Sequence, residues 1–515
     1  PGVVPDALVG LAWPAVFAVI GPVEGLLDLV HLDHRLEVVE HPTHEAELHI
    51  TAVLLSSVDT VAGRVLTVEV DFATDGRTVA NLIERFMIRG RIGSADFVAP
   101  EPLAKTETPR SQLDRFTVTS PAFMGAFATV SGDHNPLHTS IAAAKMAGFQ
   151  APIVHGMWLS AVGQRAAATA LDGQRQVKSW LTRWVAPLQL ATDVVISVER
   201  IGINEGDLVV EVTAKAAGEL LMVAEAVLSA PRTAYAFPGQ GIQAKGMGME
   251  ARTRSKAARE VWDRADAHTK ESLGFSILAV VKDNPTELLA DGELHRHPDG
   301  VLFLTQFTQV AMATLAVAQV AELREAGVFV EGSITCGHSV GEYNALAAVT
   351  GILPLEALLE IVFRRGMAMH HLVPRDAAGN SNYRLAAIRP SQADLTDEEL
   401  PEFIDGLSAD TDEFIQIVNL NLRGSQYAIA GTVAGLKALE AEIETRRARI
   451  NGKPAFILVP GIDVPFHSRE LHAGVNDFRG RLDALLPERI DASLLIGRYI
   501  PNLVPRLFNL ERDFV

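Results

Sequence analysis

Cysteine is nearly absent from this sequence: Cys336 is the only one among 515 residues. Intrachain disulfides are therefore excluded, and the sequence fits a reducing, cytoplasmic compartment. Basic charge is also scarce. The formal net charge of −18 argues against a general nucleic-acid or membrane-surface binder, because either would need a basic face. The most apolar stretch, residues 7–23, is interrupted by Pro14, Gly21 and Pro22, so we expect a buried helix there and no membrane span.

The chain is too long for a single hydrophobic core and should form about three domains. Its N-terminal part lacks any regular metal-ligand spacing, although it is rich in histidine. We interpret these residues as packing or solvent-facing and expect no metal site: His31, His34, His41, His44 and His49.

Residues 36–99 contain three runs of alternating apolar and polar residues, which predict an antiparallel sheet: Glu47 to Val53, Gly63 to Phe72 and Thr78 to Arg89. With the apolar helix ahead of them, they suit one long helix wrapped in a curved sheet. The Pro- and Thr-rich stretch from Ala99 to Arg110 is expected to be a linker. Alternation resumes from Trp180 to Leu228, which predicts more strands.

A loop with the sequence SGDHNPLH, from Ser131 to His138, lies between two helix-forming stretches. It offers a carboxylate, Asp133, and an imidazole, His138. A later helix opens near Gly156, and its free amides would point at any group bound at its N-terminus. These groups are what proton transfer beside a thioester carbonyl requires. The alternative is that Asp133 caps a helix and His138 is a surface residue.

SGDHNPLH followed by AGFQAPIVHGM closely resembles the signature of the (R)-specific enoyl hydratases and of the dehydratase domains of type I fatty acid synthases. The resemblance implies Asp133 and His138 as the catalytic pair and the Gly156 amide as carbonyl donor. It implies α+β hot-dog folds, in which a helix is wrapped in an antiparallel sheet. Residues 1–105 then resemble a degenerate hot dog without the motif, and residues 106–230 the dehydratase.

A second motif, GHSVG, lies between a strand-like run ending at Cys336 and a helix-forming run from Tyr343. Strand, serine and helix in this order predict a nucleophile elbow, with Ser339 exposed and the Val340 amide placed to hold an oxyanion. The alternative is a glycine-rich turn with an inert serine.

Further segments could serve this serine. The loop of Pro238 to Gly241 could donate a second oxyanion amide. A predicted helix from Ile361 carries Arg364 and Arg365, and a guanidinium facing the elbow could clamp a carboxylate. Residues 383–459 alternate as β, α, β, β, α, β, which predicts a ferredoxin-like insert within about 376–459. His467 follows a β-type run and is our candidate general base.

The motifs FPGQG, GHSVGE, RGMAMH, NLNLRGSQYAIAG and PFHS stand in family order and resemble the malonyl/acetyltransferases. This implies an α/β acyltransferase domain over residues 231–515. Its implied roles are Ser339 as nucleophile, His467 as base, Arg365 as malonyl clamp, and the amides of Gln240 and Val340 as oxyanion hole. No acidic triad member is evident, and the resemblance implies that a backbone carbonyl orients His467.

Two positions leave questions in this resemblance. Asn421 falls within the insert motif without an assignable role. The family's usual Gln after RGxxM is replaced by His370.

A double hot-dog dehydratase followed by a malonyl/palmitoyl transferase matches the domain order of type I fatty acid synthases of the fungal and actinobacterial kind. The resemblance implies coenzyme A thioesters and the phosphopantetheine of acyl carrier protein as substrates, with no bound cofactor. Implied partners are acyl carrier protein, other synthase domains and further copies of the chain. We expect a fragment of a longer polypeptide. Rival interpretations are a polyketide synthase segment, a serine hydrolase, and an inactive scaffold that docks carrier protein.

Overall fold

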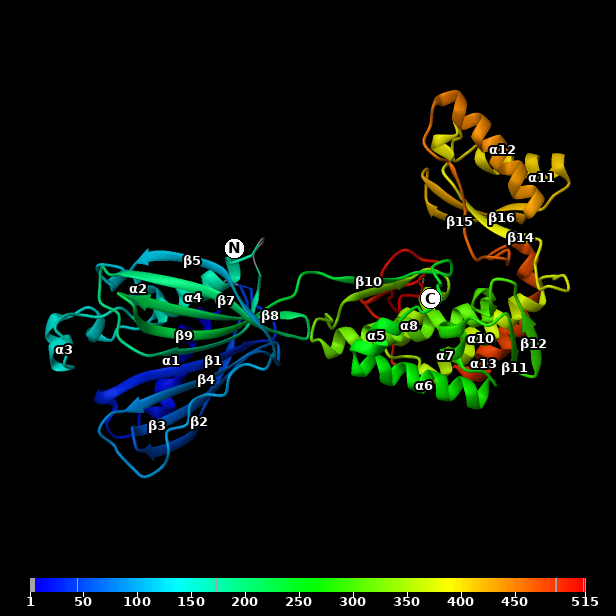
Figure 1. The fold of residues 1–515 in the computed structure, drawn as a ribbon. Coiled ribbons are helices and arrows are strands. Elements are labelled where there is room, and N and C mark those ends of the chain that lie inside the picture. Colours follow the sequence, from blue (N-terminus) through cyan, green and yellow to red (C-terminus); the bar gives the residue numbers. More distant parts are fainter. Residues whose placement is uncertain (1–4, 44, 172–174, 487–488, 513, 515) are drawn as a thin grey trace. The chain divides into compact units, whose positions relative to one another are not determined.

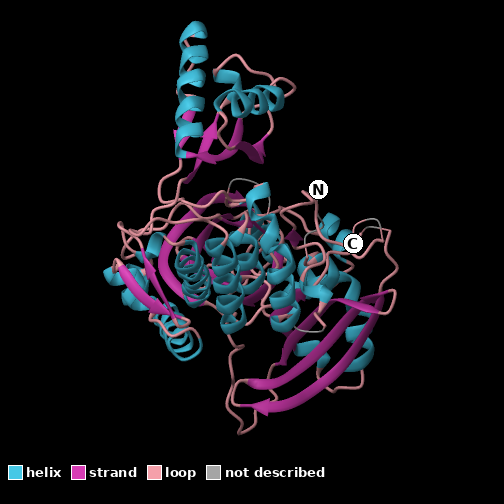
Figure 2. Cartoon of the chain, turned by 90° about the vertical axis from the view of Figure 1, so that its right-hand side faces the viewer, coloured by secondary structure: helices cyan, strands magenta, loops and turns pink. Residues whose placement is uncertain are grey.

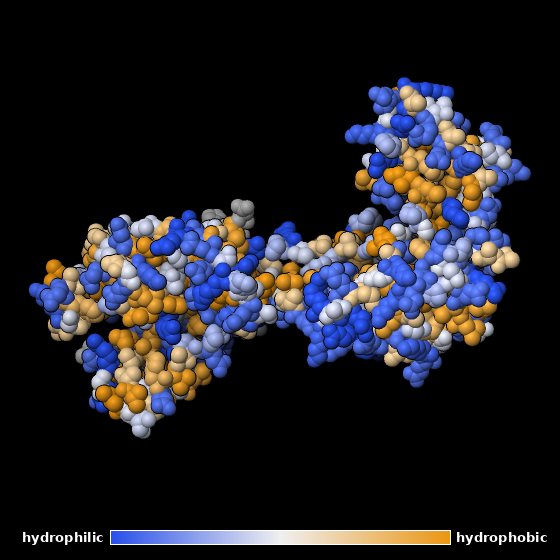
Figure 3. All heavy atoms as spheres, in the orientation of Figure 1, coloured by the Kyte–Doolittle hydropathy of each residue, from blue (hydrophilic) through white to orange (hydrophobic). Residues whose placement is uncertain are grey.

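The computed structural model describes residues 5–43, 45–171, 175–486, 489–512 and 514, so the sequence prediction for His44 lies outside the described residues. The chain divides into two compact units (Figure 1). One contains residues 1–232 with 326–331, and the other contains residues 233–325 with 332–515. None of the described helices combines the length and apolarity that a bilayer-spanning segment needs. Hydrophilic residues are spread over the visible face of each unit (Figure 3).

The first unit is built on a nine-stranded antiparallel sheet in the order β2-β3-β4-β1-β6-β9-β8-β7-β5. Its strands are β1 (Leu29–Val38), β2 (His49–Thr60), β3 (Gly63–Thr74), β4 (Arg77–Ile88), β5 (Thr106–Thr119), β6 (Val177–Trp184), β7 (Asp193–Asn204), β8 (Asp207–Ala216) and β9 (Glu219–Leu228). Its helices are α1 (Ala7–Ile20), α2 (Gly125–Ser131), α3 (Ile141–Met146) and α4 (Gly156–Thr169), with short 3-10 turns η1 (Leu26–Asp28) and η2 (Pro136–His138).

Two similar halves share this sheet. In the N-terminal half, α1 packs its apolar side against β1–β4 around a core that includes Leu36, Leu66 and Phe86. In the C-terminal half, α4 packs against β6–β9 around Trp180. The halves join where β1 pairs with β6. Each half is one helix wrapped in an antiparallel sheet, so the predicted double hot dog is confirmed.

The N-terminal half contains one strand, β1, that was not named among the predicted runs. Its sequence contains His31, Asp33 and His34, which conceal the apolar alternation. In the structure Asp33 forms a buried ion pair with Arg85 at 2.6 Å, and His34 is fully buried. Asp33 and His34 thus depend on partners that the fold supplies, Arg85 and Asp6.

The linker prediction was wrong for its second half. Strand β5 already begins at Thr106, whose partner on β7 is Ile203. Pro109 made this stretch look unstructured, but β5 is an edge strand of the sheet and its pairing is irregular between Glu107 and Ser111. Proline is tolerated at such an edge irregularity, because no ladder hydrogen bond is lost there.

The second unit has a parallel sheet of β10 (Ala234–Phe237), β13 (Ile334–Gly337) and β18 (Tyr499–Ile500), in the order β10-β13-β18. The helices of the core are α5 (Met249–Arg254), α6 (Lys256–Ser272), α7 (Ile277–Asp283), α8 (Thr305–Glu325), α9 (Val340–Ala348), α10 (Leu355–His371) and α13 (Val475–Leu485). A hairpin of β11 (Glu287–Ala290) and β12 (Glu293–Arg296) precedes α8. Helix α8 is buried for most of its length, and Trp262, Phe307 and Phe363 anchor the core around it.

The insert of this unit has the predicted order of elements: β14 (Tyr383–Ile388), α11 (Leu400–Thr411), β15 (Ile415–Leu422), β16 (Gln426–Thr432), α12 (Val433–Ile450) and β17 (Phe456–Leu458). Its antiparallel sheet has the order β15-β16-β14-β17. Both helices pack on one face of this sheet (Figure 2). This arrangement is ferredoxin-like, as the sequence predicted.

Candidate active sites

Ser339 lies at a sharp turn between β13 and α9. Its backbone has φ 55° and ψ −115°, which is a strained conformation for a residue with a side chain. Both flanking residues must be glycine, because neither position has room for a side chain. A Cβ at Gly337 would come within 2.1 Å of Gly341, and one at Gly341 within 2.2 Å of the Phe237 carbonyl. The structure therefore places Ser339 on the strand-to-helix turn that the motif predicted, with Val340 as the first residue of α9.

His467 faces Ser339 from the loop that follows β17. Its Nε2 lies 3.1 Å from Ser339 Oγ. Although His467 as a whole is exposed, burial of the imidazole, with the positive charge of Arg365 and with His338 adding to it, lowers its pKa to about 4. The imidazole is therefore neutral at pH 7 and can accept the proton of the Ser339 hydroxyl.

Arg365 projects from α10 and is buried, with 8% of its surface exposed. One Nη donates to Ser339 Oγ at 3.1 Å and the other to Gln309 Oε1 at 2.8 Å. Gln309 Nε2 donates to Thr305 Oγ1 at 2.8 Å, and this hydroxyl donates to Gln240 Oε1 at 3.0 Å. A chain of buried and partly buried hydrogen bonds thus connects the predicted carboxylate clamp with the predicted oxyanion loop.

The sequence analysis did not identify Gln309 and Thr305. Both are fully buried on α8, where polar side chains need partners. The signal was available in the sequence, because TQFTQ puts several polar residues into an otherwise apolar helix. Such residues in a buried helix indicate a hydrogen-bonded network.

A cavity of about 170 Å³ lies beside Ser339, between core and insert segments of the second unit. From the core it is lined by Gln240, His338, Ser339, Val340, Arg365, Ile462, Phe466 and His467, and from the insert by Leu385, Ala387, Asn419, Asn421, Gln426, Ala428 and Val459. The predicted residues of the transferase therefore meet around one space. Asn421, which had no role, lies in the wall of this cavity.

His370 occupies a different place. Its ring packs 5.5 Å from that of His295, and it is not among the described residues that line the cavity. Burial, with nearby Arg375 and His295 contributing, lowers the pKa of His370 to about 3, so it is neutral at pH 7.

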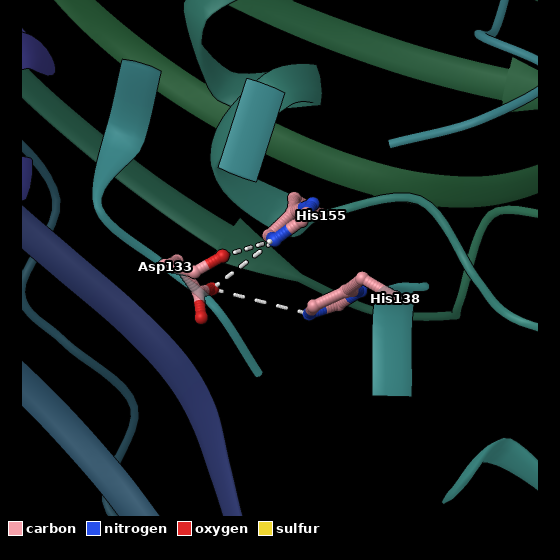
Figure 4. A group of neighbouring side chains, drawn as sticks. All are labelled: Asp133, His138 and His155. Carbon is pink, nitrogen blue, oxygen red and sulfur yellow. Dashed lines mark hydrogen bonds and ion pairs between the residues drawn. The ribbon is translucent and has the colours of Figure 1, made fainter. Parts of the chain in front are cut away.

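The second candidate site lies in the C-terminal half of the first unit, where Asp133, His138 and His155 face one another (Figure 4). Asp133 Oδ2 lies 4.0 Å from His138 Nε2 and 3.5 Å from His155 Nε2. The two imidazole rings are stacked, with centroids 3.7 Å apart. The predicted pair is therefore brought together, and His155 joins it. The sequence analysis missed His155, although it stands directly before Gly156 in the IVHGM string.

Hydrogen bonds assign the proton positions of these two histidines. His138 Nδ1 lies 3.0 Å from the Ile153 carbonyl oxygen, so Nδ1 carries the proton and Nε2 has a free lone pair. His155 Nε2 lies 3.1 Å from the Asp133 carbonyl oxygen and therefore carries its proton. Burial lowers the pKa of His138. Burial and the neighbouring His138 lower that of His155 to about 4, so both rings are neutral at pH 7.

The same three side chains have ligand atoms within 4.8 Å of one another, a spacing that a metal ion could bridge. His155 Nε2, however, already donates its proton to a backbone carbonyl. That nitrogen has no lone pair left for a metal in this tautomer. The arrangement of the group is better suited to moving a proton between Asp133 and His138.

Gly156 is the first residue of α4, so its amide is one of the unpaired donors at the helix N-terminus. His155, directly before it, is the N-cap residue. The predicted carbonyl donor therefore directly follows one member of the Asp133, His138 and His155 group.

Comparison with known families identifies both parts of the chain. Residues 102–219 match the MaoC like domain, and residues 234–450 match the acyl transferase domain. The chain thus carries a MaoC-like dehydratase domain followed by an acyl transferase domain.

Similar proteins are found among fatty acid synthases. The beta subunit stcK of Emericella nidulans is 30% identical over 532 residues, covering 90% of this chain and 27% of that protein. The subunit beta of Saccharomyces cerevisiae is 30% identical over 493 residues, covering 79% and 24% respectively. The crystal structure of FabD from Acinetobacter baumannii is 24% identical with a TM-score of 0.42, covering 54% of this chain and 76% of that one. The chain is a homologue of fungal fatty acid synthase beta subunits and spans about a quarter of their length.

Proposed function

We propose that this chain is a bifunctional part of a fatty acid synthase. One site transfers malonyl and long acyl groups between coenzyme A and acyl carrier protein, and the other dehydrates (3R)-hydroxyacyl thioesters. The observation that carries the proposal is the meeting of His467 and Arg365 at Ser339 Oγ, each at 3.1 Å, beside a cavity. Acyl carrier protein, other synthase domains and further copies of the chain are the proposed partners, and the cytoplasm is the proposed location.

In the transferase step, His467 Nε2 takes the proton of Ser339 as Oγ attacks the thioester carbonyl of malonyl-coenzyme A. The amides of Val340 and Gln240 stabilise the oxyanion. Coenzyme A leaves as the thiol after receiving the proton from His467. The acyl group stays on Ser339 until the phosphopantetheine thiol of the carrier protein attacks it by the reverse path.

In the dehydration step, the Gly156 amide holds the thioester oxygen, which makes the α-proton more acidic. His138 Nε2, with its free lone pair, removes that proton. Asp133 protonates the departing hydroxyl, and water leaves with the trans-2-enoyl thioester formed. The proton on His138 then returns to Asp133 through a water molecule, because the 4.0 Å between Nε2 and Oδ2 is too long for a direct hydrogen bond.

Arg365→Ala is expected to lower malonyl transfer by about 10- to 100-fold while affecting palmitoyl transfer far less. The reason is that only malonyl has a free carboxylate for the guanidinium to bind. Initial rates with both coenzyme A esters and a pantetheine acceptor measure the effect.

The matched control for this variant is Arg364→Ala. Arg364 is the neighbouring residue on α10, but it forms its ion pair with Asp291 of the β11–β12 hairpin. This variant should keep both rates. Equal losses of malonyl and palmitoyl transfer in Arg365→Ala would assign Arg365 a structural role.

The pH dependence of acyl loading should follow His467. Because its pKa is lowered to about 4, the base stays neutral and loading stays constant from neutral pH down to about pH 5, below the usual histidine range near 6.5. Removing the positive charge in Arg365→Ala should move the acid limb to higher pH, since this charge disfavours the imidazolium. Single-turnover release of coenzyme A at a series of pH values measures the acid limb of each of the two proteins. An acid limb that is the same in both proteins would exclude this coupling.

A further inference from the structure

Trp184, at the end of β6, makes two contacts with the first residue of α4. Its indole Nε1 donates to the Gly156 carbonyl oxygen at 2.9 Å. The indole also lies close against Gly156, because a Cβ there would come within 2.8 Å of Nε1. Trp184 therefore holds the carbonyl of Gly156 and covers its Cα, and the amide of this same residue is the predicted oxyanion donor.

The other side of Trp184 packs on the N-terminal half of the unit. Its ring centroid lies 4.5 Å from that of His31 and 5.5 Å from that of His34, both on β1. His34 Nε2 lies 3.0 Å from Asp6 Oδ1. Gln164 of α4 bonds Asp6 twice, accepting from its backbone N–H at 3.0 Å and donating to Oδ1 at 2.7 Å.

These contacts form a closed path from α4 to the N-terminal half and back. It starts at Gly156, passes through Trp184, His34 and Asp6, and returns to α4 at Gln164. His34, Asp6 and Gln164 are all buried, with exposures of 0%, 6% and 1%. Buried hydrogen bonds of this kind have strict geometry and are costly to break.

Two further close contacts support the same end of α4 and the loop beside it. Met157, the second residue of α4, belongs to the core of the N-terminal half rather than to that of its own half. On α1, a Cβ at Gly10 would come 2.8 Å from the carbonyl oxygen of Ser131, two residues before Asp133. The half without the motif therefore packs against both segments that carry the dehydratase site.

We propose that Trp184 is a positioning residue of the dehydration reaction, through which the N-terminal half fixes the first turn of α4 and the direction of the Gly156 amide. This inference rests on the proposed dehydratase function. The half that lacks the catalytic motif thus contributes to the chemistry by holding the oxyanion donor in place.

Trp184→Phe tests this inference, because it keeps an aromatic ring but removes the indole donor. Oxyanion contacts count most in the transition state, so kcat for a (3R)-hydroxyacyl-coenzyme A should fall about 10- to 100-fold with little change in KM. The matched control is Trp180→Phe. Trp180 is on the same strand, and its Nε1 donates to Ser160 Oγ at 2.9 Å, one turn further along α4. Its kcat should stay close to that of the unchanged protein.

A spectroscopic measurement separates positioning from a general loss of structure. A conjugated dienoyl-coenzyme A bound with its carbonyl at the Gly156 amide should absorb at longer wavelength, because the hydrogen bond polarises the thioester. This shift should shrink in Trp184→Phe and persist in Trp180→Phe. Equal kcat values and equal shifts in the two variants would overturn the inference. If the protein without any substitution shows no dehydratase activity, the proposed function is overturned instead.

Gln164→Met gives an independent arm if Trp184→Phe does not fold. It keeps the length of the side chain but removes both bonds to Asp6, far from the reacting atoms. A lower kcat at similar KM is expected, and an unchanged kcat would exclude the N-terminal half from the positioning of α4.

Discussion

Replacing Ser339 by alanine is expected to abolish acyl loading and malonyl transfer, while dehydration of a (3R)-hydroxyacyl thioester continues at the unchanged rate. Loading requires Ser339 Oγ, which forms the ester. Among the described residues, this oxygen is the atom that hydrogen-bonds to both His467 Nε2 and Arg365 Nη2. Dehydration persists because the two sites lie in separate compact units with their own cores. Release of coenzyme A from malonyl-coenzyme A and formation of the enoyl product measure the two activities in one preparation.

Ser333→Ala is the matched control for this variant. Ser333 is buried just before β13, and its hydroxyl has no hydrogen-bond partner among the described residues. Removing that hydroxyl should leave loading intact. A Ser339→Ala protein that still forms a stable malonyl adduct would contradict the assignment of the nucleophile.

The second large effect is expected in the dehydratase. Asp133→Asn and His138→Ala should each reduce dehydration by about a hundred- to ten-thousand-fold, because each removes one of the two groups that carry the protons. Loading of Ser339 should be preserved in both variants. Conversion of a (3R)-hydroxyacyl-coenzyme A, followed by the absorbance of the enoyl thioester, measures the loss.

His134→Ala is the control within the same loop, since His134 is an exposed neighbour of Asp133. It should retain the full rate. Near-normal turnover in either Asp133→Asn or His138→Ala would mean that the residue concerned is a helix cap or a surface group.

Local patterns were sufficient to predict much of the fold. The β, α, β, β, α, β order of the insert came from clear alternation and helix-forming runs, and each element appears in the structure. The strand-to-helix turn at Ser339 was predictable because Gly337 and Gly341 leave room for nothing larger. These features depend on residues close together in the sequence.

Features that depend on distant partners were missed. Strand β1 is concealed by His31, Asp33 and His34. The fold pairs Asp33 with Arg85 and His34 with Asp6, and neither partner is close in the sequence. The hydrogen bonds from Arg365 through Gln309 and Thr305 to Gln240 join segments far apart in sequence. The stacking of His155 on His138 likewise requires a loop and a helix N-terminus to meet.

The proposed transferase reaction depends on Ser339 taking up the acyl group. Intact-mass analysis of the chain after incubation with malonyl-coenzyme A, followed by peptide mapping of the modified residue, tests it most directly. Cys336, the only thiol in the chain, lies three residues from Ser339, so mapping must distinguish the two. We expect one malonyl group per chain, carried on Ser339 and absent from Ser339→Ala. An unchanged mass, or a malonyl group on Cys336 or any other residue, would contradict it.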